Sequence, residues 1–229
     1  MKNLVKNPAT LVCFPNSALG LTSFSNQGSG HHGWNPTDSI PPSFGRAPLL
    51  WTFRKKMMDN INVLDAKKYS LRDIVIFFSS KSSQRINIDF TKHFHETNKL
   101  VPELEKRISS LVGHDRLRVI VKHQVLHEMS AKEQIEETSR VCVFITAAGG
   151  GAFTAQFLPK GSSIILYQHS EGEHLHKGNV DWKFFNAATW MRAKFLDFTT
   201  TAHDTKSLSK LVQTEALNCV QFMEALDVI

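Results

Sequence analysis

One segment of the sequence, between residues 141 and 167, constrains the fold more than any other. A hydrophobic run with the composition of a strand (141–146) leads to three consecutive glycines, Gly149 to Gly151. A helix-compatible stretch follows, and after a proline and a glycine the run 162–167 again has the composition of a buried strand. Glycines let a backbone lie close to a ligand, and the N–H groups at a helix start favour an anion. This order of strand, glycine turn, helix and strand therefore predicts a phosphate site.

The same alternation extends along the chain. Continuous apolar runs at 73–78 and 117–121 predict strands that are covered on both faces. Helices are predicted over 48–63, over 102–112 with a stop at Gly113, over 131–140 after the capping box of Ser130 and Glu133, and over 205–227. Strands that alternate with helices predict an α/β fold with a doubly wound, Rossmann-like parallel sheet.

The chain divides into two parts. Residues 1–70 form a loop-rich segment followed by a helix, and residues 71–229 form the α/β domain. Residues 25–42 have the Gly and Pro punctuation of a long loop. The first 70 residues are too few for a second Rossmann unit.

Composition limits the classes of partner. The net charge is +6 and the pI is about 9.3, which suits an anionic ligand. The sequence has no block of Lys and Arg and no repeat of basic and aromatic residues, so we expect no nucleic-acid partner. It has no apolar run of ~18 residues, so we expect no transmembrane segment.

The cysteines leave the redox compartment open. They number three and form no CxxC motif, and a disulfide between Cys13 and Cys219 is one open alternative. Cys142, inside an apolar run, is expected to pack as a small hydrophobic residue.

Several motifs, in this order, resemble glycosyltransferase family 61 over about residues 12–200. Ala148 to Ala152 followed by Phe157-Leu158-Pro159 is similar to the family's glycine-rich motif, and the loop that contains Arg85 is similar to its Arg-containing loop. The segment Met129 to Ile135, with Gln134, looks like its Glu-Gln helix start. The resemblance implies the C-terminal half of a GT-B enzyme that transfers the sugar of a UDP-sugar with inversion at the anomeric carbon. It also implies a glycan or glycoprotein acceptor and the lumen of the Golgi or ER.

The sequence departs from the family at one position. Ala148 stands where the family has a histidine before the glycines. The side chain of alanine neither donates nor accepts hydrogen bonds, so a degenerate or truncated, non-catalytic module that binds a nucleotide sugar is the alternative function. Residues 1–70 would then be the remnant of a domain on the acceptor side.

The expected binding site combines cations with backbone amides. The sequence contains no Asp-x-Asp pair, so we expect the diphosphate to be stabilised without a metal or other cofactor. Arg85 is the first candidate to grip it and Lys81 the second, together with the amides of residues 149–152. The resemblance adds Gln134.

No residue can be named from sequence as the catalytic base. His123, His127, Glu171 and Asp181 are all candidates near the expected edge of the sheet. A dinucleotide-dependent oxidoreductase is a weaker alternative because the glycines do not fit G-x-G-x-x-G. A serine hydrolase is disfavoured because no G-x-S-x-G occurs. The paired histidines show no third ligand at a spacing typical of zinc sites.

Overall fold

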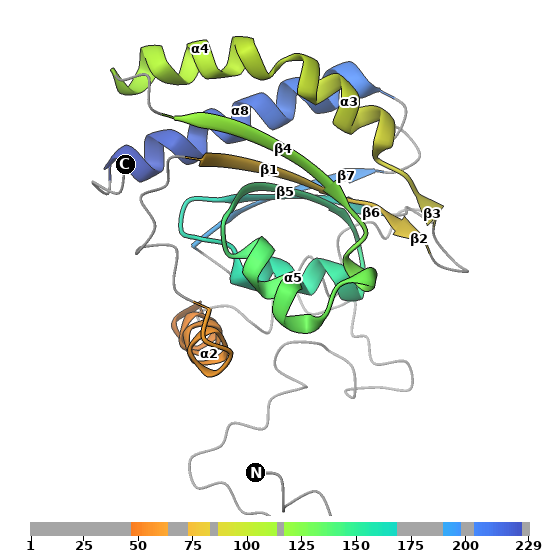
Figure 1. Cartoon of the computed structure of the whole chain (residues 1–229), viewed down its shortest axis with the longest axis vertical. Coiled ribbons are helices and arrows are strands. Elements are labelled where there is room, and N and C mark those ends of the chain that lie inside the picture. The colour runs from red at the N-terminus through yellow and green to blue at the C-terminus, as the bar shows by residue number, and fades with distance from the viewer. Residues whose placement is uncertain are drawn as a thin grey trace, which may run out of the picture.

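The computed structural model describes residues 47–63, 73–82, 87–113, 117–168, 190–197 and 204–225. These residues contain a five-stranded sheet of order β4-β1-β5-β6-β7, and each neighbouring pair is parallel. The strands are β1 (Asp73–Ser79), β4 (Arg118–Gln124), β5 (Val141–Ala147), β6 (Ser163–Gln168) and β7 (Arg192–Asp197). The structure confirms the predicted doubly wound parallel α/β fold (Figure 1).

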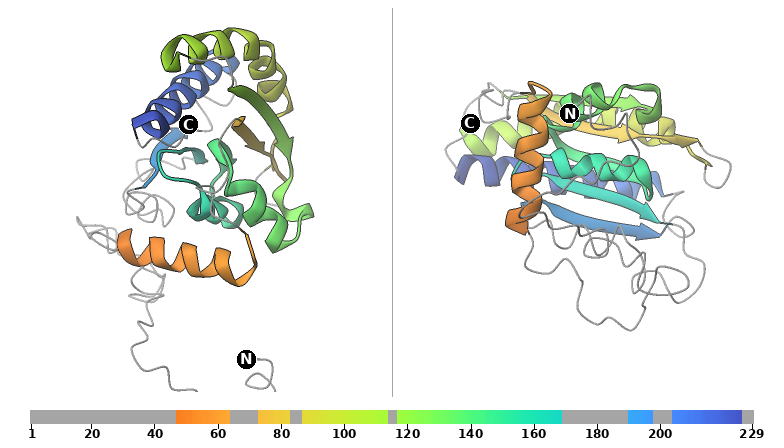
Figure 2. Two further views of the ribbon diagram at one scale, coloured as in Figure 1. Left: turned by 60° about the vertical axis from the view of Figure 1, so that its left-hand side comes forward. Right: turned by 90° about the horizontal axis from the view of Figure 1, so that it is seen from below.

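Helices cover both faces of this sheet (Figures 1 and 2). One face lies under α3 (Thr91–Lys99), α4 (Val101–Val112) and α8 (Thr205–Ala225). The other lies against α5 (Ala131–Thr138) and the 3₁₀ helix η3 (Gly150–Phe157), and α2 (Ala47–Asn60) packs on η3 from outside. The short elements are the β2 (Lys81–Ser82) and β3 (Asn87–Ile88) pair and the 3₁₀ turn η2 (Leu126–Glu128).

The strand side chains build one core on each face. Ile76 and Phe78 of β1 are buried with residues of α4 and α8, whereas Val75 and Phe77 are buried with residues of η3. Because both faces are covered, β1 and β5 are continuous apolar runs rather than alternating ones. Burial of each large apolar side chain contributes about 1.5–3 kcal/mol. These central strands therefore hold both helical layers.

Local signals in the sequence set several element ends. Gly113 ends α4 with φ 73, in the left-handed region that glycine adopts most readily. Ser130 begins α5 with a capping box: its Oγ accepts from the Glu133 N–H at 3.3 Å, and Glu133 Oε2 accepts from the Ser130 N–H at 2.7 Å. Both signals were predicted from sequence.

Five elements were not predicted: α3, β2, β3, the 3₁₀ turn η2 and β7. The sequence of α3 is mostly polar, and among its residues only His93 and Thr97 are buried. β7 is an edge strand whose alternating Arg192 and Lys194 break up any apolar run. The segment after the glycines is a 3₁₀ helix.

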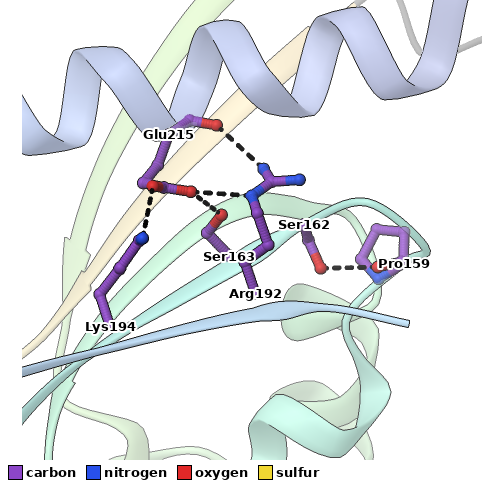
Figure 3. A network of polar contacts seen from close by, with 6 residues as sticks. All are labelled: Pro159, Ser162, Ser163, Arg192, Lys194 and Glu215. Atoms are coloured by element: carbon purple, nitrogen blue, oxygen red, sulfur yellow. Dashed lines mark hydrogen bonds and ion pairs between the residues drawn. The ribbon is translucent and has the colours of Figure 1, made fainter. Parts of the chain in front are cut away.

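A buried carboxylate fastens α8 to the strands β6 and β7 (Figure 3). Glu215 is 1% exposed, and its Oε2 accepts hydrogen bonds from Ser163 Oγ and, at 2.9 Å, from Arg192 Nε. Lys194 Nζ lies 3.8 Å from Glu215 Oε1. Burial raises the pKa of Glu215, but the hydrogen bonds from Ser163 and Arg192 and the nearby positive charges outweigh it and lower the pKa. Ser163 and Arg192 begin their strands, so this network lies at the amino edge of the sheet.

Helix α2 is fastened to the domain by a buried arginine. Arg54 is fully buried, and its Nε and Nη2 donate to Phe157 O at 3.2 and 3.1 Å. The guanidinium also lies 4.4 Å from the centre of the Trp51 ring.

The domain boundary expected at residue 70 falls outside the described residues, and the division into two parts stays a prediction.

Candidate functional site

The order of the strands creates a switch point at the carboxyl ends of β1 and β5. From β1 the chain crosses to β4 over the face of α3 and α4, and it returns through α5 on the opposite face to β5, on the other side of β1. The connections after β1 and β5 therefore leave in opposite directions. In doubly wound sheets, ligands bind beyond the carboxyl ends of the strands at such a point.

Lys81 and the glycine turn meet at this switch point. Lys81 follows β1, and its Nζ donates a 2.6 Å hydrogen bond to the carbonyl oxygen of Ala148, directly after β5. A Cβ added to Gly149 would lie 2.5 Å from this Nζ. Gly149 also has φ 121, a conformation that other residues rarely adopt. Glycine at this position thus lets an ammonium group lie against the start of η3.

Tight packing does not explain the other two glycines. A Cβ on Gly150 would meet nothing within 4 Å. A Cβ on Gly151 would meet only Leu126 Cδ1, at 3.9 Å, which is an ordinary contact. Both glycines are exposed, so the space above their backbone is open to a ligand.

The amides of the turn differ in what they contact. The first N–H groups of a helix have no carbonyl partner within it. Ala152, whose side chain is fully buried, donates its N–H to Gly149 O at 2.9 Å. Among the described residues, the N–H groups of Gly150 and Gly151 have no acceptor. Two of the expected amides are therefore available, whereas that of Ala152 already has an acceptor in the protein.

Gln134, another predicted binding residue, is not brought into this contact. Gln134 lies in α5, and its side-chain Nε2 donates to Met129 O at 3.0 Å. This hydrogen bond ties the side chain to the residue before the N-cap of α5. Arg85 lies outside the described residues. The binding roles of Gln134 and Arg85 stay predictions.

A second polar group lies at the carboxyl ends of β1 and β4. Ser80 Oγ and His123 Nε2 are 2.6 Å apart, and the Phe90 N–H donates to Ser80 Oγ at 2.9 Å. The Phe94 ring stacks on the imidazole with a centroid distance of 5.7 Å. The imidazole of His123 is therefore held by a hydrogen bond and by an aromatic ring.

Electrostatics favour the neutral form of His123. Partial burial lowers its pKa, His95 lowers it further, and the carboxylate of Asp89 opposes them, so that the pKa falls below 6.5. His127, in η2, is exposed, and Glu171 and Asp181 lie outside the described residues. Of the candidate bases, His123 is the one that the described residues hold in a defined polar contact.

Sequence reasoning missed Ser80. One signal was present, because a serine that directly follows a buried strand lies at the edge where ligands bind. Its partner depends on the parallel register, in which Phe78 pairs with His123 and Ser79 with Gln124. That register is a property of the folded sheet.

Two further features bear on the kind of protein. Among the described residues, no group of three or more His, Cys, Asp or Glu side chains could hold a metal ion. No helix in the described part of the chain has both the length and the apolar character needed to cross a membrane.

The solved structures that are similar to this chain include a flavodoxin-like domain. No family model matches the chain, and no curated protein matches it. The chain is similar to the crystal structure of a flavodoxin-like domain from Synechococcus sp., at 12% identity and a TM-score of 0.35. The match covers 66% of this chain and 99% of that domain. The assignment of the fold therefore depends on the strand order described above.

Proposed function

We propose that this chain is the nucleotide-sugar-binding domain of an inverting, metal-independent glycosyltransferase. The donor is a UDP-sugar, the acceptor is a hydroxyl of a glycan or glycoprotein, and the reaction belongs to the lumen of the Golgi or ER. One observation carries the proposal: the Lys81 ammonium lies against the glycine turn at the switch point of the sheet. The family resemblance of the sequence supplies the donor, the acceptor and the compartment.

The chemistry of this contact suits a diphosphate. Sugar transfer leaves negative charge on the departing phosphate oxygen, and fixed positive groups stabilise that charge. Lys81 offers a compact point charge, and the amides of Gly150 and Gly151 offer donors at the positive end of a helix. These groups can act on a diphosphate without a metal ion.

A binding module without turnover is the second candidate. Ala148 replaces the histidine of the family motif, and its carbonyl oxygen already accepts from Lys81. This residue therefore gives a ligand no polar side chain. A module of this kind would bind UDP and UDP-sugars but would release no sugar.

Ligand-induced stabilisation tests the proposal. UDP at 100 times its dissociation constant should stabilise the protein by about 2.7 kcal/mol in a thermal melt, and NAD and flavin mononucleotide at the same concentration should not. Lys81→Met should abolish the UDP response, while the matched control Lys106→Ala, at an exposed position of α4, should keep it. A shift with NAD or flavin mononucleotide alone would refute the proposal. Sugar release then separates the enzyme from the binding module.

A further inference from the structure

The hydroxyl of Ser80 lies between the Phe90 amide and the imidazole of His123. A serine hydroxyl has one proton and two lone pairs. The Phe90 N–H occupies one lone pair at 2.9 Å, and His123 Nε2 lies 2.6 Å away, within the range for an O–H to nitrogen bond. When the neutral imidazole of His123 carries its proton on Nδ1, the Ser80 O–H donates to Nε2, and one lone pair of Oγ remains for a ligand hydroxyl.

The pair adjoins the proposed diphosphate site along the chain. Ser80 and Lys81 are consecutive residues at the carboxyl end of β1, and successive side chains of an extended chain point to opposite faces. Lys81 accordingly reaches the glycine turn on the η3 face, and Ser80 reaches His123 on the α3 face. A donor and an acceptor lying across the end of β1 would meet both groups.

We propose that Ser80 and His123 form a proton relay that activates the acceptor hydroxyl, an assignment that rests on the proposed function. The acceptor oxygen forms a bond to the anomeric carbon of the sugar as the bond from that carbon to the phosphate oxygen breaks. UDP leaves with the bonding electron pair. The acceptor proton passes to Ser80 Oγ, and the Ser80 proton passes to His123 Nε2.

The surroundings of His123 suit both the neutral and the protonated form of the imidazole that the relay requires. Before the reaction the neutral imidazole can accept a proton, because burial lowers its pKa. After the reaction the imidazolium lies near the carboxylate of Asp89, which favours the charged form. His95 is the other titratable neighbour among the described residues, and it opposes the charge. The Phe94 ring, stacked on the imidazole, keeps the ring in place.

The test compares UDP binding with sugar release. UDP-glucose, UDP-xylose and UDP-N-acetylglucosamine serve as donors with water as acceptor, and UDP release is measured from pH 5 to 8. His123→Gln keeps a hydrogen-bonding group beside Ser80 but accepts no proton. It should bind UDP as the wild type does and release sugar roughly 10²-fold or more slowly. Ser80→Ala should show the same separation, and Ser110→Ala, at an exposed position of α4, is the matched control with unchanged rates.

The pH profile separates catalysis from structure. The wild-type rate should fall with acid through the pKa of His123, below 6.5, because the protonated imidazole accepts no proton. His123→Gln should lose this acid limb, which a variant with only a structural defect would keep. A wild type that binds UDP without sugar release, an unchanged rate in His123→Gln, or a covalent sugar on Ser80 in mass spectra would each overturn the relay. Absence of any UDP shift in the wild type would instead refute the proposed function.

Discussion

Gly150→Ala tests the phosphate site without disturbing the fold. The added methyl group would meet no atom within 4 Å, and Gly150 has no positive φ, so alanine fits the backbone. A compatible Gly→Ala change stabilises a protein by about 0.4–1 kcal/mol through the unfolded chain. For a protein of this size, the melting temperature should rise by about 1–4 °C.

The same methyl group should weaken UDP binding. It would project into the open space above the amides of Gly150 and Gly151, where a phosphate oxygen would have to approach. We expect at least a tenfold loss of affinity, about 1.4 kcal/mol, measured by isothermal titration with UDP. Unchanged affinity in a folded Gly150→Ala protein would show that no phosphate lies on this turn.

Substitution of a second glycine, Gly113, should have the opposite effects on stability and on UDP affinity. Gly113 ends α4 with φ 73, and a Cβ there would also meet nothing within 4 Å. Gly113→Ala therefore adds only backbone strain, about 1–2 kcal/mol, and should lower the melting temperature. UDP affinity should not change, since Gly113 ends α4 before β4 begins, and α4 covers the face of the sheet opposite to η3 (Figure 1). If UDP affinity rose and fell with stability in Gly150→Ala and Gly113→Ala, the proposed phosphate site would be wrong.

Three further predictions concern stability. The pKa of Glu215 is lowered in the folded state, so its contribution to stability should be full above the ordinary pKa of 4.5 and should be lost as the pH falls through the lower folded pKa. In melting curves measured from pH 6 to 3, the melting temperature of Glu215→Gln should therefore depend less on pH than that of the wild type. Gly161→Ala should cost more than about 1 kcal/mol, because φ is 82 and the new Cβ would lie 2.1 Å from the Phe222 ring; adding Phe222→Ala should recover part of the loss in a double-mutant cycle. Ser130→Ala should cost about 0.5–2 kcal/mol in urea unfolding, and a loss below this range would remove the capping box as a stabilising feature.

The fold was predictable where local signals agree with tertiary packing. β1 and β5 are apolar throughout because both faces are buried, and Gly113 and Ser130 mark helix ends through their own backbone chemistry. The edge strand β7 gave no such signal, since Arg192 and Lys194 alternate along it. The charges of β7 are explained by Glu215, which lies on a helix that follows in the sequence.

The site was predictable in part for the same reason. The glycine turn is local in sequence, but the contact between Lys81 and Ala148 joins residues 67 positions apart, and that between Ser80 and His123 joins residues 43 positions apart. Both depend on which strands lie next to β1. Sequence patterns predict that strands exist, whereas their order decides which loops share an edge.

The position of Lys81 is itself an argument for an anion. A cation at the amino end of a helix is unfavourable by about 0.3–1 kcal/mol, and a hydrogen bond that involves a charged group, such as that from Lys81 to Ala148 O, contributes about 1.5–3 kcal/mol. The helix end therefore offsets only part of the hydrogen bond in the ligand-free protein, and Lys81→Met should cost about 0.5–2.7 kcal/mol of stability. With a diphosphate bound, both the lysine and the helix end become favourable, and the variant should lose the UDP response. A Lys81→Met protein that is strongly destabilised without ligand would show that the lysine serves the fold instead.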